Sequence, residues 1–108
     1  MSKRDIPLPL YTIYALAEPL NGVVRYVGLS NDVKKRYREH VQRANNQFEK
    51  DTWILSLIDQ QLLPTLLILE ENIAGEDKAR EREEYWLNFY EEKDHILTWN
   101  GIKSEVQA

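Results

Sequence analysis

Five polar side chains occupy positions where the hydrophobic pattern of the chain calls for apolar ones: Tyr14, Tyr26, Arg36, His40 and Glu83. A guanidinium binds phosphate through paired hydrogen bonds and keeps its charge. A lone inward carboxylate suits Mg²⁺, which takes oxygen ligands and retains most of its waters. A phenol is a poor base unless a cation and a neighbouring imidazole or phenol stabilise the phenolate. The set therefore fits metal-assisted phosphodiester hydrolysis without a serine or cysteine nucleophile.

Each of these residues also has a purely structural interpretation. A strand tyrosine usually packs with its hydroxyl at the rim of the core, and an inward arginine or histidine is usually a hydrogen-bonded core residue. Glu83 can simply be paired with Arg80 or Arg82. Asn100, a sixth candidate, stands in an apolar tail before Gly101. Its simpler interpretation is a turn residue without a role in a site. The hypothesis of a site rests on the whole set.

The two tyrosines lie in segments that predict a β-hairpin. Residues 8–19 and 23–28 are rich in β-branched and aromatic side chains. Pro19 favours a connecting loop of about five residues, 18–22, over a two-residue turn at Asn21-Gly22.

The loop decides which sheet face each tyrosine occupies. A loop centred on Leu20 places Tyr14 directly opposite Tyr26, with their Cβ atoms about 5 Å apart on one face. A tight Asn21-Gly22 turn would place them on opposite faces. We expect the shared face.

Arg36 and His40 belong to a predicted helix that starts at the capping residues Ser30-Asn31-Asp32 and runs to about Ala44. At about 100° per residue, its apolar stripe consists of Val33, Tyr37, Val41 and Ala44. Arg36 and His40 fall within that stripe, which is costly unless each has a partner. The other bases of the helix point outward: Lys34, Lys35 and Arg38.

The rest of the chain predicts two more helices and a third strand. We expect Asp51 to cap a helix over residues 52–63 that ends before Pro64, with four inward side chains: Trp53, Ile54, Leu57 and Ile58. Residues 65–70 form a continuous apolar run typical of a buried strand.

Glu83 belongs to the last predicted helix, over residues 75–91. The inward stripe of this helix is apolar: Ala79, Trp86, Leu87 and Tyr90. Glu83 lies inside that stripe, whereas Glu81 and Glu84 lie outside it. Together these elements predict an α+β fold, a small, mainly antiparallel three-stranded sheet flanked by three helices.

The length and composition restrict the possible classes of protein. A chain of 108 residues fits one domain, expected over residues 1–108 with its core at about 8–102. Without cysteine there is no disulfide, thiolate zinc site or cysteine nucleophile. The apolar runs are too short to span a bilayer, and residues 1–9 lack the apolar core of a secretory signal. We therefore expect a cytoplasmic protein without a membrane partner.

The net charge of −4 hides two segments of opposite sign. Residues 22–43 carry a net charge of +4 and residues 66–94 a net charge of −6. Both can be solvated helix faces. They can also be two walls of one site, one binding an anion and the other holding a metal. The acidic average argues against a polyanionic partner, or at least for weak and salt-sensitive binding of one.

The order and spacing of these residues resemble the GIY-YIG nuclease family over about residues 8–102. The signature strands are matched by Thr12-Ile13-Tyr14 and Tyr26-Val27-Gly28, with Thr12 in place of glycine and Val27 in place of isoleucine. Arg36 follows the second tyrosine by ten residues and His40 stands four further on. Glu83 precedes a Trp-Leu pair by three residues, and Asn100 resembles the asparagine that closes the motif set.

The resemblance implies an αββααβα-type domain that cleaves DNA, double-stranded or branched, with one divalent metal ion, Mg²⁺ or Mn²⁺. Glu83 would hold the metal, Arg36 would bind the scissile phosphate and Tyr14 would be the general base. Tyr26 and His40 would support that phenol or position the water, and Asn100 would brace the site. The DNA backbone would be bound by bases of segment 22–43: Arg25, Lys34, Lys35 and Arg38.

Two other functions compete with the nuclease. One is a non-catalytic nucleic-acid-binding module that kept the fold, and the other is a protein-interaction domain that uses its acidic helix. The inward Glu83 disfavours both, because neither function needs it. A domain this small also has little room for its own specificity element, so we expect it to recognise DNA shape or to act in a homo-oligomer or larger complex.

Overall fold

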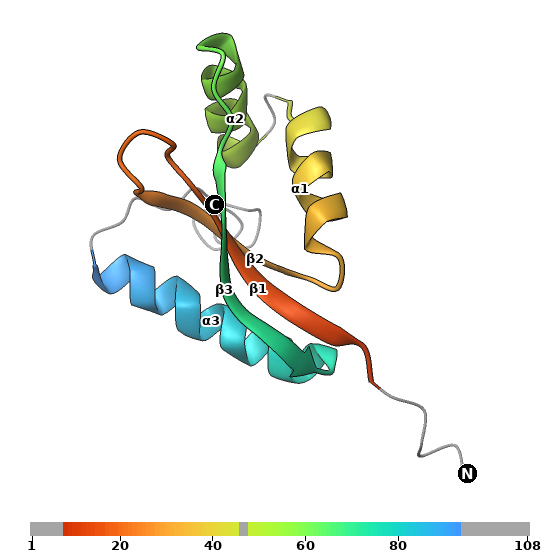
Figure 1. Ribbon diagram of the computed structural model, residues 1–108. Coiled ribbons are helices and arrows are strands. Elements are labelled where there is room, and N and C mark those ends of the chain that lie inside the picture. The colour runs from red at the N-terminus through yellow and green to blue at the C-terminus, as the bar shows by residue number, and fades with distance from the viewer. Residues whose placement is uncertain (1–7, 46–47, 94–108) are drawn as a thin grey trace.

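A computed structural model describes residues 8–45 and 48–93. Its elements follow one another in the order ββααβα: β1 (Leu10–Ala17), β2 (Val24–Ser30), α1 (Val33–Gln42), α2 (Glu49–Asp59), β3 (Thr65–Ala74) and α3 (Glu76–Glu92). The strands form one antiparallel sheet in the order β2-β1-β3 (Figure 1). The predicted α+β fold with three strands and three helices is confirmed. The first helix of the αββααβα pattern is not among the described residues.

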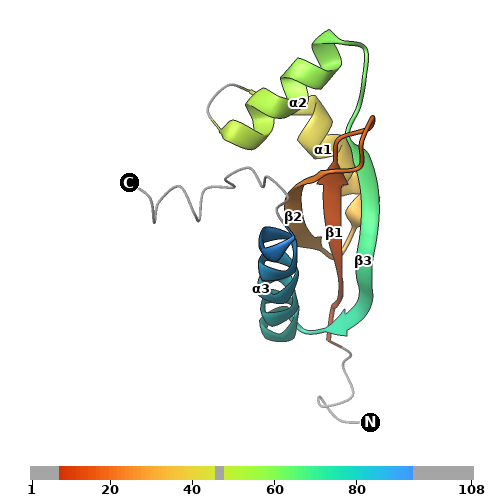
Figure 2. The same cartoon turned by 90° about the vertical axis from the view of Figure 1, so that its left-hand side faces the viewer.

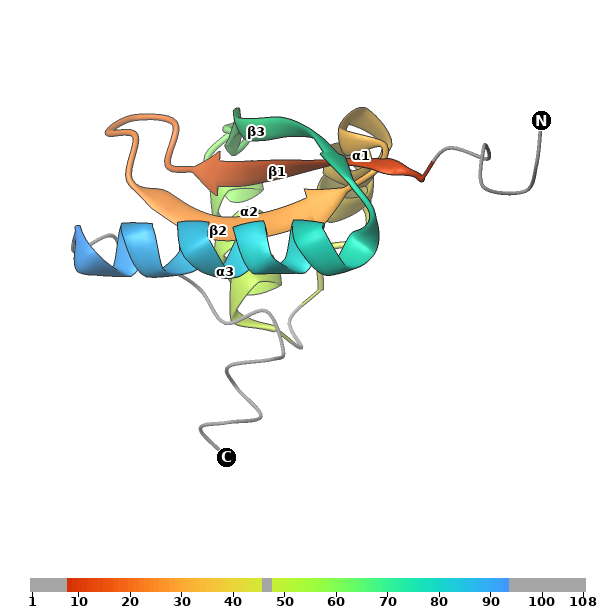
Figure 3. The same ribbon diagram turned by 90° about the horizontal axis from the view of Figure 1, so that it is seen from below.

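The central strand β1 divides the apolar core into two layers. Ile13, Ala15 and Ala17 pack with α3 on one face, and Tyr14 and Leu16 pack with α1 and α2 on the other. Successive residues of a strand point to opposite faces, so a strand covered on both sides buries all of them. Figures 2 and 3 show α3 running along the sheet beside β2, with α1 and α2 away from it.

The register of the hairpin confirms the shared face and corrects the pairing. Tyr14 lies opposite Gly28, and Leu16 lies opposite Tyr26. The prediction that Tyr14 faces Tyr26 directly was wrong because β2 carries an extra, bulged residue at Arg25 and the loop is longer than expected. The pairing therefore moves by two positions, which keeps both tyrosines on the α1–α2 face.

The helix starts are also only partly as predicted. Asp32 caps α1, and its carboxylate accepts a hydrogen bond from the Lys35 N–H at 3.2 Å. The prediction that Asp51 caps α2 was wrong: the helix begins at Glu49, with Phe48 at the N-cap position. Both Glu49 and Asp51 lie in the first turn, where the positive end of the helix dipole favours acids.

The C-terminal end of α2 lies four residues earlier than expected. Gln61 adopts a left-handed conformation, with φ 63°, and the Leu62 N–H donates to the Leu57 carbonyl at 2.8 Å. This closes the helix at Asp59. The predicted inward position of Ile58 was wrong, since the residue is 38% exposed.

The third strand is longer and less buried than its apolar run suggests. β3 extends to Ala74 and, among the described strands, pairs with β1 alone, so it lies at the edge of this part of the sheet. Ile68 is exposed on it, whereas Ile73 is buried. The predicted full burial of residues 65–70 was therefore wrong. Among the described residues, none of the helices combines the length and the apolar composition that spanning a bilayer requires.

Candidate active site

Tyr14, Tyr26 and His40 form one aromatic cluster between the sheet and α1. The Tyr14 hydroxyl lies 2.6 Å from His40 Nε2. The ring centroid of Tyr26 is 6.2 Å from that of Tyr14 and 5.0 Å from that of His40. His40 is 5% exposed and Tyr14 is fully buried. The fold thus brings together three of the predicted site residues from three different elements.

Gly28 makes room for this cluster. A Cβ atom at this position would lie 2.7 Å from the Tyr14 hydroxyl oxygen and 2.9 Å from Cε2 of Tyr26. Real Cβ atoms do not approach other atoms this closely. Because Gly28 lies opposite Tyr14 in the sheet and two residues after Tyr26, its missing side chain is what lets both phenols share one face.

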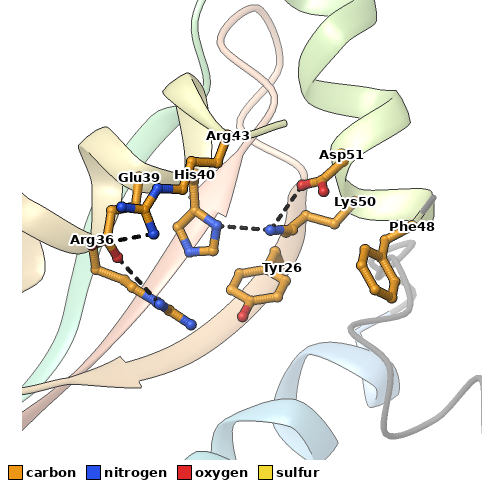
Figure 4. A pocket seen from close by; sticks show the side chains of 8 residues that line it. All are labelled: Tyr26, Arg36, Glu39, His40, Arg43, Phe48, Lys50 and Asp51. Carbon is orange, nitrogen blue, oxygen red and sulfur yellow. Dashed lines mark hydrogen bonds and ion pairs between the residues drawn. The ribbon is translucent and has the colours of Figure 1, made fainter. Parts of the chain in front are cut away.

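A pocket of about 230 Å³ opens beside the cluster. Figure 4 shows that its walls come from β2, α1, the segment before α2 and α2 itself: Tyr26, Arg36, Glu39, His40, Arg43, Phe48, Lys50 and Asp51. Tyr26 therefore faces the pocket directly, whereas the fully buried Tyr14 lies behind it.

Among the pocket residues that were not predicted to belong to the site, Lys50 and Asp51 lie next to the aromatic cluster. Lys50 Nζ lies 2.9 Å from His40 Nδ1 and 5.4 Å from the ring centroid of Tyr26. It also pairs with the buried carboxylate of Asp51 at 2.9 Å. Lys50 was missed because the predicted helix began after Asp51 and so did not include it. The periodicity of one helix also does not show which residues of another helix it contacts.

The electrostatics keep the cluster uncharged. Burial, together with the positive charges of Lys50 and Arg36, lowers the pKa of His40 to about 3. Burial raises the pKa of Tyr14, and the neighbouring Tyr26 raises it further, whereas Arg36 lowers it. Burial likewise raises the pKa of Tyr26. The free protein thus holds a neutral imidazole and two protonated phenols at neutral pH.

Arg36 lies at the rim of this pocket and is less buried than its place in the helix stripe predicts. Its side chain is 51% exposed and forms an ion pair with Glu39 at 3.3 Å. Its charge still acts on both Tyr14 and Tyr26. A half-exposed guanidinium next to a pair of phenols can bind an incoming anion without first leaving a buried partner.

Glu83 projects from α3, which packs on the other face of the sheet. Its side chain is half-buried, and burial raises the pKa of its carboxyl. Among the described residues, no hydrogen bond or ion pair uses this carboxylate, because the neighbouring arginines have other partners: Arg80 pairs with Glu76 at 2.7 Å and Arg82 with Glu70 at 2.8 Å. The charge of Arg80 nevertheless lowers the pKa of the Glu83 carboxyl, so these two side chains interact without forming a direct ion pair.

The surroundings of Glu83 connect it to the tyrosine cluster and fit a metal ion of a particular kind. Its negative charge raises the pKa of Tyr26, so the carboxylate lies within electrostatic reach of that phenol. Within the described ranges no three potential ligands gather in one place. A half-buried carboxylate outside any such group of three fits an ion such as Mg²⁺, which fills its remaining positions with water and phosphate oxygens.

Residues 10–95 match the model of the GIY-YIG catalytic domain. The chain belongs to the GIY-YIG family. No curated protein and no solved structure gave a match. Membership in the GIY-YIG family identifies the domain as nuclease-type, with DNA as the substrate and a divalent metal ion as the general requirement.

The bases predicted to bind DNA in this GIY-YIG domain differ in exposure and in ion pairing. Three bases on α1 are exposed: Lys34, Lys35 and Arg38. Arg25 is instead held in an ion pair with Glu18 at 2.7 Å, with its guanidinium over the ring of Trp53. Asn100 lies outside the described residues.

Proposed function

We propose that this chain is a DNA endonuclease that hydrolyses phosphodiester bonds with a tyrosine general base and a divalent cation, Mg²⁺ or Mn²⁺. The observation that carries the proposal is the 2.6 Å hydrogen bond between Tyr14 and His40, formed beside a pocket with a half-exposed arginine at its rim. The imidazole of His40 is buried and has a hydrogen-bond partner on each of its ring nitrogens.

In the proposed reaction, Arg36 binds two oxygens of the scissile phosphate and aligns it with the attacking water. Tyr14 first releases its hydroxyl proton to solvent, and the phenolate then takes the proton of that water while the water oxygen forms its bond to phosphorus. The bond from phosphorus to the leaving sugar oxygen breaks, and that oxygen leaves with the bonding electron pair. Burial opposes formation of the phenolate, whereas the charge of Arg36 and the hydrogen bond to His40 favour it.

Glu83 is the residue proposed to hold the metal ion. Bound there, a divalent cation would stabilise the negative charge that develops on the phosphate and the leaving oxygen. The exposed bases Lys34, Lys35 and Arg38 are proposed to contact the DNA backbone. With so few free bases on an acidic protein, we expect binding to weaken steeply as salt rises.

One observation makes Tyr26 a second candidate for the general base. Tyr26 lines the pocket, whereas Tyr14 is fully buried behind it. Replacement of each tyrosine by phenylalanine separates the two. The residue that takes the proton should leave only background cleavage when replaced, whereas a supporting phenol should lower the rate and leave its pH dependence in place.

Plasmid nicking with Mg²⁺, Mn²⁺ or chelator tests the function itself. Glu83→Gln should abolish metal-dependent cleavage while DNA binding is retained. Glu84→Gln is the matched control, because it removes the same charge from the next residue, whose side chain is exposed. Cleavage that survives Glu83→Gln would refute the metal-ligand assignment. DNA binding without cleavage of any substrate would instead identify a non-catalytic binding module.

A further inference from the structure

The imidazole of His40 has a partner on each of its two nitrogens. Nε2 lies 2.6 Å from the Tyr14 hydroxyl oxygen, and Nδ1 lies 2.9 Å from Lys50 Nζ. Figure 4 shows the Lys50 side chain reaching from the start of α2 toward the His40 ring on α1. A neutral imidazole carries one proton, so one nitrogen donates and the other accepts. The chemistry of these two partners decides which nitrogen of His40 donates and which accepts.

Lys50 can act only as a donor in this contact. An ammonium group has three N–H donors and no lone pair. Lys50 Nζ also lies 2.9 Å from the buried carboxylate of Asp51 and 5.4 Å from the ring centroid of Tyr26, which are the contacts of an ammonium group with an anion and with an aromatic face. His40 Nδ1 must therefore accept, and the imidazole proton must be on Nε2. The imidazole itself stays neutral, because its pKa is lowered to about 3.

We propose that Lys50 is a positioning residue that fixes the tautomer of His40, so that His40 Nε2–H donates a hydrogen bond to the Tyr14 oxygen. The inference rests on the proposed function and adds the direction of the hydrogen bond between His40 and Tyr14. With its proton on Nε2, His40 cannot remove the Tyr14 proton, and it stabilises the phenolate instead. The opposite tautomer would direct a lone pair at Tyr14 and make His40 a base toward it.

The tautomer can be measured without DNA or metal, by two-bond ¹⁵N–¹H NMR correlation of the histidine side chains. We expect the wild-type His40 to be protonated on Nε2 throughout pH 5–8. Lys50→Met should populate the Nδ1-protonated form and raise the pH at which the ring titrates, whereas Lys50→Arg should keep the wild-type pattern. Lys78→Met is the matched control, because it removes one positive charge at an exposed site on α3.

Two results would overturn this assignment: protonation of Nδ1 in the wild type, or an unchanged tautomer in a folded Lys50→Met variant. The wild-type spectrum alone therefore tests the inference, even if Lys50→Met fails to fold. Because the NMR measurement needs no catalysis, a protein that never cleaves DNA would refute the proposed function and leave the tautomer result intact.

Cleavage kinetics test the consequence for catalysis separately. Lys50→Met should lower kcat by about tenfold or more with little change in KM, because an imidazole in the wrong tautomer fails in the reaction step. Lys50→Arg should recover most of that loss. An unchanged kcat in Lys50→Met, together with the shifted tautomer, would refute the role of Lys50 in the reaction.

Discussion

Mild acid should destabilise this protein, because His40 is folded into its core as a neutral imidazole. The side chain is 5% exposed and faces two cations, Lys50 from α2 and Arg36 from its own helix, together with the uncharged phenols of Tyr14 and Tyr26. The carboxylates of the pocket already pair with those cations, Asp51 with Lys50 at 2.9 Å and Glu39 with Arg36 at 3.3 Å. Protonation of His40 is therefore much easier in the unfolded chain than in the folded one.

The size of the effect follows from the two pKa values. The pKa of His40 falls from an ordinary value of 6.5 to about 3 on folding. A lowered pKa contributes stability that is complete above the unfolded value and is lost as the pH falls from about 6.5 toward 3. Between pH 7 and pH 5 the free energy of unfolding should therefore decrease by about 2 kcal/mol from this residue alone, and by pH 4 by about 3 kcal/mol.

Urea denaturation at pH 7, 6 and 5, followed by circular dichroism, measures this loss. His40→Gln keeps an amide donor for Tyr14 and removes the titration, so the stability gap between wild type and variant should narrow by about 2 kcal/mol from pH 7 to pH 5. Carboxylates shared by both proteins cancel in the comparison. His95→Gln, which removes the other histidine of the chain, should keep the wild-type dependence. A gap that stays constant would refute neutral burial of His40.

Three further outcomes follow from the contacts around the two faces of the sheet. Gly28→Ala should lower the free energy of unfolding by about 1–3 kcal/mol and abolish cleavage, since its methyl group would collide with the Tyr14 hydroxyl; an unchanged melting temperature would contradict this. Trp86→Phe should cost about 1 kcal/mol in urea denaturation, because it removes the 3.0 Å hydrogen bond from Nε1 to Glu70. The cleavage rate should rise about tenfold for each pH unit between pH 7 and pH 9, because the phenolate fraction of Tyr14 grows. A cleavage rate that does not change with pH over this range would exclude a tyrosine base.

Local periodicity predicted the inward or outward position of several site residues, although Ile58 and Ile68 are more exposed than it indicated. Tyr14 and Tyr26 share a face, and Glu83 is half-buried while Glu84 is exposed, as the two periods of strand and helix predict. The position of Glu83 depends only on its place within its own helix. The shared face of the two tyrosines also depends on the pairing of two strands, and it was predicted correctly because the pairing moved by an even number of positions.

Contacts between elements could not be predicted in the same way. The bulge at Arg25, the edge position of β3 and the contact of Lys50 with His40 all depend on how separate segments pack. Arg36 is a further example. Its position in the helix stripe is inward, but a pocket opens beside it and leaves half of the side chain exposed. Periodicity predicts the direction in which a side chain points, whereas tertiary packing decides whether it meets another side chain, a pocket or solvent.

The register of the hairpin sets how this domain can tolerate insertions. The loop between the two strands closes through hydrogen bonds of Glu18 with Val23 and Gly22, outside the ladder that holds the tyrosines. A residue added at the exposed tip, near Leu20, can be looped out with little cost to the site. One residue added between Tyr26 and Gly28 would instead send one of the two to the opposite face and separate the glycine from Tyr14. The hairpin thus has an insertion-tolerant tip and a segment in which even one added residue breaks the candidate site.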